Sequence, residues 1–357
     1  MDEVPEARAI PDPTVEEMVR TVEPGIEVER AVPVERGFCS VYRVAVEGGP
    51  TRTLYLKASP DGERWGIPDE ARLQAVLHDR TSIPVPEVLG VVDAHGDLPA
   101  PFYLMSALPG EELPYEHVGR FDDDALRRLA RETGAYLGEL HSVPAVDSFG
   151  HVRHDGPGLA GDRPSGHPDT LTVGNPRESW SDYLRAYADR EFDRHADSRF
   201  SDLTPDLTRW FEAGVDDLAG PFDPVLGRND HGLHNFLLDP ESGSITGMID
   251  WGYTLAVPAS FDVEFAVYVL GGAYLAGLSD VQDRRSLVRE AMLSGYRASA
   301  PDRTDAVATP DPLYEMLAMV RLMNDFGSLD LPEGTEEAAA DRIREDAREL
   351  LAGDRYG

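Results

Sequence analysis

The chain has 357 residues, and its 66 acidic side chains outnumber 33 lysines and arginines, which gives a formal net charge of −33 at pH 7. A protein this acidic repels the phosphates of nucleic acids and the anionic surface of a membrane, so general binding to either is excluded. Because 41% of the residues are hydrophobic, a disordered chain is excluded as well. The length allows one large domain or two lobes that each have a core.

The basic residues are divided very unevenly between the two types. Lys57 is the only lysine, so 32 of the 33 basic residues are arginine. Many carboxylates together with arginine in place of lysine indicate a salt-adapted (halophilic) host, where dissolved ions screen the repulsion between acidic side chains. A genome rich in G and C would explain the loss of lysine, but it would not explain the excess of acid.

Three features of the sequence concern the compartment. Cys39 is the only cysteine, so neither an intrachain disulfide nor a cysteine-rich zinc site is expected. The first residues lack the basic segment and the apolar core of a signal peptide. The longest apolar stretch, 265–278, is shorter than the roughly 20 residues that span a bilayer. We therefore expect a cytoplasmic protein, present as a monomer or a homodimer.

The N-terminal third of the chain predicts mostly β-structure. Residues 1–25 are acidic, and we expect them to form an N-terminal extension with one short helix at 14–22. A helical pattern occupies 68–79, with Pro68 in the first turn, where proline is favoured. Runs rich in β-branched and aromatic residues predict five strands, at 26–34, 40–46, 53–59, 82–94 and 100–110. The prediction is a five-stranded antiparallel sheet with one helix after the third strand.

The rest of the chain predicts mostly helices. Residues 121–141 place leucines on one face of a helix, whereas 152–176 is rich in Gly, Pro, Asp and His and is expected to be a long loop. Short apolar strands then flank a polar loop, and residues 241–244 mark the turn of a hairpin. Further helices are predicted at 178–195 and 203–218 and, from Ser260 onward, in four segments that end with 336–351.

This order of elements predicts the fold class. A small antiparallel β lobe with one helix, 26–107, precedes a larger and mainly helical lobe, 108–357. Such an α+β chain resembles the bilobal protein kinase-like fold, in which the nucleotide is held between the lobes.

The residues best suited to chemistry lie in the polar hairpin. Asp230 and Asn235 precede one short strand, and Asp250 ends the next. Phosphoryl transfer needs one carboxylate that orients or deprotonates the attacking hydroxyl, and a second carboxylate and an amide oxygen that hold Mg²⁺ on the phosphates. Since a hairpin brings its two ends together, we expect Asn235 and Asp250 to converge on one metal ion.

This stretch resembles the motif of the aminoglycoside phosphotransferase and choline kinase-like family, H-x-D-x-x-x-x-N followed by I-D-[WF]. The resemblance implies that Asp230 is the catalytic aspartate and that Asn235 and Asp250 are metal ligands. It also implies a structural role for Asp262, which would anchor the catalytic loop. The chain departs from the pattern at Arg228, where the family has His, and at the next residue, Asn, where it has Gly. We expect Arg228 to support the loop backbone.

The second signal is Lys57. It lies on the third predicted strand, and Glu70 follows 13 residues later on the predicted helix. In kinase-like folds a third-strand lysine contacts the α- and β-phosphates and is fixed by a glutamate of the next helix. Two surface charges would give the same spacing, but Lys57 is the one lysine retained in a chain that otherwise uses arginine.

Weaker signals come from three further places. Gly37 and Ser40, between the first two strands, are candidate neighbours of the phosphates, although a plain hairpin turn explains them equally well. The backbone near Ser106 and Leu108 resembles the hinge that pairs with adenine in this family. His141 resembles a family histidine that we expect to cap a helix end.

The resemblance covers about residues 26–330 and implies an enzyme that uses ATP, or GTP, and Mg²⁺ to phosphorylate a hydroxyl of a small molecule. Because acid is spread over the whole chain, it does not identify the acceptor. An aminoglycoside suits a salt-adapted cell poorly, so we favour a metabolic alcohol.

Two other hypotheses remain open. One is a binding protein that keeps the kinase fold without catalysis, which the arginine at position 228 would favour. The other is a metal-dependent hydrolase that uses the cluster of Asp230, His231, His234 and Asp250. Outside that hypothesis, we expect the two histidines to face the substrate or the solvent.

Overall fold

The computed structural model describes residues 9–34, 39–47, 52–59, 66–156, 158–218, 220, 222–276, 278, 281–329 and 331–353. It consists of two compact units. The first comprises Met1–Pro109, Val152–Thr172 and Thr246–Tyr253, and the second comprises Gly110–His151, Val173–Ile245 and Thr254–Gly357. This division differs from the expected boundaries, 1–25, 26–107 and 108–357, because two later segments fold with the N-terminal unit.

The first unit contains the five-stranded antiparallel sheet that the sequence predicts. Its strands have the order β1-β2-β3-β5-β4, and α2 (Ile67–Arg80) follows β3 in the chain. The strand bounds are β1 Glu27–Val34, β2 Ser40–Glu47, β3 Thr53–Ala58, β4 Val88–Val92 and β5 Phe102–Ser106. The prediction of five strands and one inserted helix is therefore confirmed.

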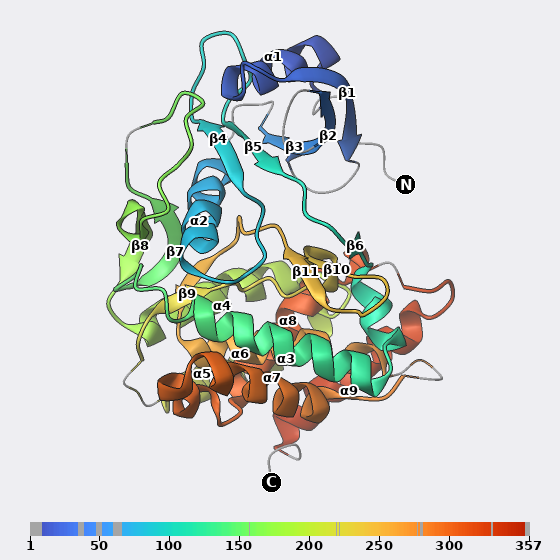
Figure 1. The fold of residues 1–357 in the computed structure, drawn as a ribbon. Helices are drawn as coiled ribbons and strands as arrows, with labels where there is room; N and C mark the ends of the chain where they lie inside the picture. The colour runs from blue at the N-terminus through green and yellow to red at the C-terminus, as the bar shows by residue number, and fades with distance from the viewer. Residues whose placement is uncertain are drawn as a thin grey trace. The chain divides into compact units, whose positions relative to one another are not determined.

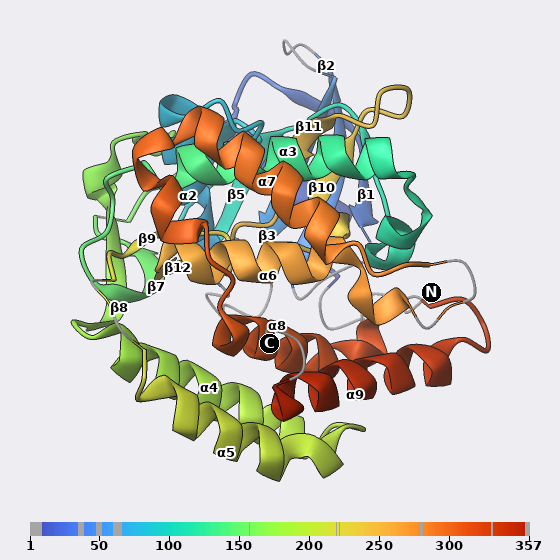
Figure 2. The ribbon, with the colours of Figure 1, turned by 90° about the horizontal axis from the view of Figure 1, so that it is seen from below.

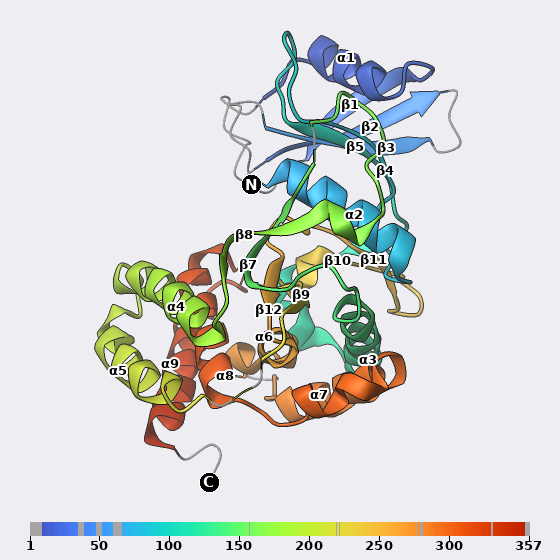
Figure 3. The same cartoon turned by 90° about the vertical axis from the view of Figure 1, so that its left-hand side faces the viewer.

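Each face of this sheet is covered by one helix, and the two helices lie on opposite sides (Figures 1 and 3). Side chains of a strand alternate between the faces. Leu54, Leu56 and Ala58 of β3 therefore join one core, to which α1 (Asp12–Val22) contributes four buried side chains. Lys57 lies on the other face, the side of α2. Helix α1 thus packs into the core of the first unit.

The second unit contains the predicted helices, of which α3 and α7 run side by side (Figure 2). Their bounds are α3 Asp123–Leu140, α4 Trp180–Ala196, α5 Thr204–Val215, α6 Ala259–Gly271, α7 Arg285–Ser299, α8 Pro312–Asn324 and α9 Glu336–Ala352. Among the described residues, none of the helices combines the length and the apolar character needed to cross a membrane.

The remaining strands are short and lie outside the five-stranded sheet. A four-stranded sheet has the order β8-β7-β12-β9. The bounds are β6 Glu111–Glu112, β7 Phe149–His154, β8 Leu171–Arg177, β9 Val225–Gly227, β10 Phe236–Leu238, β11 Ile245–Met248 and β12 Leu255–Val257. The expectation that 152–176 is one long loop is therefore wrong at both ends, where the chain satisfies its backbone groups in β7 and β8.

Two glycines set the distance between α3 and α7. A Cβ on Gly134 would lie 2.0 Å from the carbonyl oxygen of Met292, and a Cβ on Gly295 would lie 1.9 Å from that of Arg131. Real Cβ atoms do not approach backbone oxygens so closely, and these neighbours are backbone atoms that a rotamer change cannot move. Each glycine is therefore required by the approach of the other helix.

Gly295→Ala is expected to destabilise the protein by about 1–3 kcal/mol, because the added methyl forces the two helices apart. The measurement is the free energy of unfolding in urea. Gly214→Ala on α5 is the matched control, since its Cβ would lie 3.3 Å from a terminal methyl carbon of Leu313, which can move. A Gly295 variant as stable as the Gly214 variant would contradict this account of the contact.

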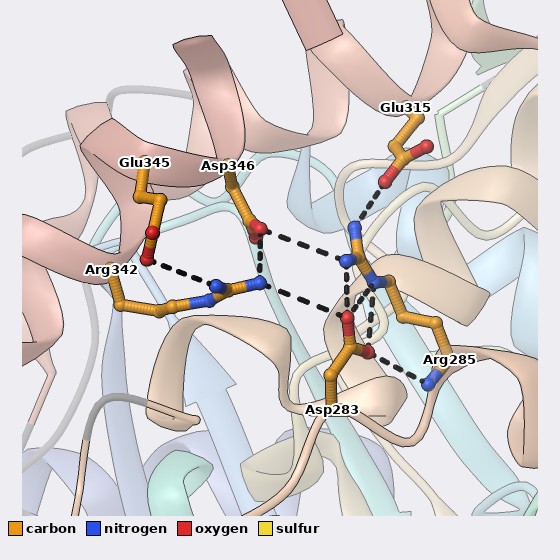
Figure 4. A network of polar contacts seen from close by, with 6 residues as sticks. All are labelled: Asp283, Arg285, Glu315, Arg342, Glu345 and Asp346. Carbon is orange, nitrogen blue, oxygen red and sulfur yellow. Dashed lines mark hydrogen bonds and ion pairs between the residues drawn. The ribbon is translucent and has the colours of Figure 1, made fainter. Parts of the chain in front are cut away.

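A network of acids and arginines ties α9 to α7 and α8 (Figure 4). Asp346 of α9 has a fully buried side chain and lies 2.6 Å from Nη2 of Arg342 and 3.7 Å from Nη2 of Arg285. Arg285 also pairs with Asp283 and Glu315. Burial raises the pKa of Asp346 to about 7, since the two arginines only partly offset burial and the two neighbouring acids add to it.

Asp346→Asn is expected to flatten the pH dependence of stability. A carboxyl whose folded pKa is about 7, above its unfolded value of about 3.9, stabilises fully below the unfolded pKa and loses this contribution as pH rises through 7. Melting temperatures between pH 4 and 8 measure how steeply stability falls with pH. Part of the fall is expected to remain in the variant, because the pKa of Glu264 is also raised to about 7.

Glu345→Gln is the control for this experiment, because Glu345 binds Arg342, as Asp346 does, but its side chain is 63% exposed. An Asp346 variant that keeps the full slope of the wild-type protein would show that this carboxyl is ionised throughout.

Candidate functional site

The loop that carries the main motif follows β9 and is fixed by a residue of α6. The carboxylate of Asp262 accepts the backbone N–H of Arg228 at 2.9 Å and that of Asn229 at 2.8 Å. Asn229 has a φ of 62° in the left-handed region, which asparagine tolerates better than most residues. This conformation explains why an asparagine can stand where the resembling motif has glycine.

Two histidines complete the environment of Asp262. Nε2 of His231 lies 2.8 Å from Oδ1, and Nε2 of His141 lies 3.1 Å from Oδ2, while the second ring nitrogen of His141 contacts the hydroxyl of Tyr296 at 3.0 Å. Burial raises the pKa of Asp262, but His231 and His141 outweigh it and hold this pKa far below its ordinary value. The carboxylate therefore stays charged.

These contacts correct two expectations. His231 does not face the substrate or the solvent, because it is buried and bound to Asp262. His141 occupies the C-cap position of α3, as expected, but its ring binds Asp262 and Tyr296 instead of the helix end. His234, in the same loop, is half-buried.

Arg228 spans the loop from inside. Its Nε donates to the carbonyl of Asp230 at 2.9 Å, its Nη2 donates to the carbonyl of Asn235 at 3.2 Å, and its guanidinium lies 5.3 Å from the ring centre of Phe236. The side chain is buried. The backbone carbonyls of two candidate site residues, Asp230 and Asn235, thus bind the same guanidinium.

Asp230 is partly buried and keeps its charge because cations surround it. Burial raises its pKa, but Arg321, His234, the N–H of Gly232 and Arg228 together bring this pKa below the ordinary value. Arg321 comes from α8 and donates Nη1 to the carbonyl of Asn229 at 2.7 Å.

Sequence reasoning missed Arg321. Its signal is a lone charge in an apolar run of α8, where every neighbour from 316 to 323 is hydrophobic. A charge at such a position is buried only when it has partners.

The first unit contains the second group of candidate residues. Nζ of Lys57 lies 2.8 Å from Oε2 of Glu70 and 3.3 Å from Oδ1 of Asp250. Burial lowers the pKa of Lys57, but the two carboxylates outweigh burial and raise this pKa well above its ordinary value. The ammonium is therefore permanently charged, and the register of β3 places it opposite Val41 and Tyr103.

Asp250 has a backbone conformation that is unusual for a side-chain-bearing residue. Its φ is 57°, and its side chain is 58% exposed although it touches Lys57. The next residue, Trp251, donates its N–H to Oε1 of Glu70 at 3.2 Å. Residues held in this region of φ often belong to functional sites, where the surrounding structure holds the strain.

The remaining candidates are placed as follows. Ser40 begins β2 and is buried, paired with Ala58 next to Lys57. Gly37 lies outside the described residues. Ser106 donates its N–H to the carbonyl of Glu87 at 2.9 Å. This bond uses only one backbone group of Ser106, so Ser106 and Leu108 both stay candidates for the hinge.

The donor atoms suit Mg²⁺ better than a transition metal. Asn235, in the second unit, and Asp250, in the first, offer amide and carboxylate oxygens, the ligands that Mg²⁺ prefers together with phosphate oxygens. Within the described part of the chain, no three His, Cys, Asp or Glu side chains gather as a metal site. The Nε2 of His231 is bound to Asp262, so this nitrogen is not directed at a metal as the hydrolase hypothesis requires.

The chain is similar to known proteins both in sequence and in fold. The model of the phosphotransferase enzyme family matches residues 31–306. Solved structures of aminoglycoside phosphotransferases share the fold. The apo form of a thermostable mutant of aminoglycoside phosphotransferase APH(4)-Ia has a TM-score of 0.59 at 13% identity, over 96% of this chain and 100% of that one.

Several of the similar structures contain ligands. A ternary complex of a thermostable mutant of APH(4)-Ia with AMP-PNP and hygromycin B has a TM-score of 0.57 at 14% identity, over 96% of this chain and 100% of that one. The GDP and kanamycin complex of APH(2")-IIia has a TM-score of 0.53 at 18% identity, over 95% and 97% of the two chains. At these identities the likeness is one of fold, and it confirms the predicted fold class.

Arg321→Met is expected to raise the pKa of Asp230 toward the ordinary value of an aspartate, because it removes the first of the cations that oppose burial. The titration of the Asp230 carboxyl carbon, followed by NMR and assigned with Asp230→Asn, measures this directly. Arg321→Lys keeps the charge and is the control. If Asp230 titrates at the same pH in the wild-type protein, in Arg321→Met and in Arg321→Lys, Arg321 does not set the charge of Asp230.

Proposed function

The chain belongs to the phosphotransferase enzyme family, and from this premise we propose that it transfers the γ-phosphoryl group of ATP or GTP, with Mg²⁺, to a hydroxyl group of a small molecule. The observation that carries the proposal is the contact of Lys57, the single lysine of the chain, with Glu70 and Asp250. This trio has the residue types that kinase-like enzymes use at the phosphates.

Lys57 would bind the phosphates of the nucleotide. A compact ammonium on a flexible stem can contact oxygens of two phosphates, and arginine, with its planar fork, does not replace it in the same geometry. Glu70 is buried and holds the ammonium from the side of α2. This requirement gives a physical reason for retaining one lysine in a chain that uses arginine elsewhere.

Asn235 and Asp250 would hold the magnesium ion. When bound, Mg²⁺ supplies the positive charge that offsets the charge developing on the transferred phosphoryl group. The exposed carboxylate of Asp250 can exchange its contact with Lys57 for a cation.

Asp230 would orient the hydroxyl of the acceptor. Its lowered pKa keeps it ionised, so it can accept a hydrogen bond from the hydroxyl at neutral pH. A low pKa also makes it a weak base. Since the transition state of phosphoryl transfer is loose, the hydroxyl proton need not leave early, and orientation counts more than basicity.

The acceptor is proposed only as a small hydroxyl compound, with a metabolic alcohol favoured. The similar structures include complexes with hygromycin B and with kanamycin, which makes aminoglycosides the alternative acceptors to test. The charge of −33 further supports an enzyme that works in concentrated salt, in the cytoplasm of a salt-adapted cell. The intact set of charged site residues argues against a binding protein without catalysis.

A phosphorylation screen over alcohols, amino alcohols, sugars and aminoglycosides, with ATP and with GTP, tests this proposal. It is run at low salt and at about 1 M salt, where the Debye length is about 3 Å. Turnover of at least one acceptor with Mg²⁺, and none when the metal is chelated, is the expected result. A protein that binds neither nucleotide under any of these conditions is not a kinase.

Asp230→Asn is expected to lower turnover of the identified acceptor by about 10²–10⁴-fold while nucleotide binding stays unchanged, because Asp230 contacts the acceptor and not the nucleotide. Rates and nucleotide affinity are measured on the same preparation. Asp223→Asn, an exposed aspartate ahead of the same loop, is the matched control. Full turnover by the Asp230 variant would remove this residue from the mechanism.

A further inference from the structure

The segment Val152–Thr172 folds with the first unit, although it lies between α3 and α4 in the chain. It runs along β4, the last strand in the order of the five-stranded sheet. Three backbone hydrogen bonds join them. The N–H of Gly161 donates to the carbonyl of Val91 at 2.9 Å, and the N–H of Val91 donates to the carbonyl of Asp162 at 3.1 Å. The N–H of Asp93 donates to the carbonyl of Leu159 at 3.0 Å. The segment thus covers the edge of the sheet with backbone hydrogen bonds.

The same segment is joined to α2 through a buried ion pair. Arg72 of α2 donates Nη1 and Nη2 to the carboxylate of Asp93 at 3.1 and 2.7 Å, and the N–H of Leu159 donates to this carboxylate at 3.1 Å. The two side chains are only 5% and 4% exposed. The side chain of Leu159 packs against a buried cluster to which α2 contributes Ile67 and Ala71.

Asp69, one residue before Glu70 in the chain, makes the third contact with this segment. It lies in the first turn of α2, and its carboxylate accepts Nη1 of Arg153 at 2.9 Å, the N–H of His154 at 2.9 Å and Nδ1 of His154 at 2.5 Å. Its side chain is 16% exposed. This turn begins at Gly66 without a side-chain cap, and the contacts of Asp69 tie it to the segment Val152–Thr172.

The residue after Asp69 is Glu70, which holds Lys57. We propose that Asp69 is a positioning residue for the nucleotide phosphates: by binding Arg153 and His154, it fixes the first turn of α2 so that Glu70 keeps the ammonium of Lys57 in place. The inference rests on the proposed function and deepens it.

The physical reason is pre-organisation. A lysine side chain has many rotamers, and it strengthens nucleotide binding only to the extent that its position is fixed beforehand. Loosening the turn that carries Glu70 therefore costs affinity for the nucleotide. A merely structural role would lower the stability of the fold without acting through Lys57.

The test measures the affinity of the full chain for AMP-PNP with Mg²⁺ by titration calorimetry. Asp69→Asn is expected to weaken binding about 3- to 10-fold, the size usual for coupled neighbours. In a protein that already carries Lys57→Met, the same substitution is expected to have no further effect. Arg163→Gln is the matched control, because it breaks an ion pair of the same segment with Glu87, away from α2.

Equal weakening with and without Lys57, or no weakening at all, overturns the proposal. If Asp69→Asn does not fold, His154→Gln is measured in its place and is expected to weaken binding in the same direction. A wild-type protein that binds neither AMP-PNP nor GDP overturns the proposed function, whereas wild-type binding matched by the variants overturns the positioning role alone.

Discussion

The carboxylate of Asp262 holds a negative charge inside the second unit, and the geometry of the loop from Arg228 to Asn235 depends on how that charge is satisfied. An isolated buried charge would cost several kcal/mol. Here two backbone N–H groups and two histidine rings surround it. Because the two N–H groups belong to Arg228 and Asn229, satisfying the carboxylate also fixes the backbone that leads into Asp230.

The two groups of candidate residues, the loop after β9 and the cluster around Lys57, differ in how their charges are balanced. At the loop that follows β9, the buried anion is Asp262 of α6, and two backbone N–H groups and two histidine rings of the protein itself satisfy its charge. The group around Lys57 has one cation between two carboxylates, which leaves an excess of negative charge. Such a group gains from a divalent cation, and for this reason we propose the Lys57 cluster, and not the loop after β9, as the part that binds the metal and the nucleotide.

Local sequence patterns predict those parts of the structure that local physics determines. Alternating β-branched residues placed the five strands, and the pairing of Lys57 with Glu70 followed from strand and helix spacing. Contacts between distant segments leave no such pattern. Asp69 and His154 are 85 residues apart, and the segment after β7 reads as a loop because its hydrogen bonds are made with β4. Arg321 was missed because its partner, the carbonyl of Asn229, lies 92 residues earlier in the chain. His231 was misplaced because its partner, Asp262, lies on α6.

The covered edge of the five-stranded sheet also bears on aggregation. Exposed strand edges can pair with other chains, and net charge normally keeps such chains apart. In concentrated salt this long-range repulsion is screened, so an acidic protein needs protection that does not depend on charge. The segment beside β4 supplies it with backbone hydrogen bonds, while the opposite edge, β1, carries Pro33, which has no N–H to offer.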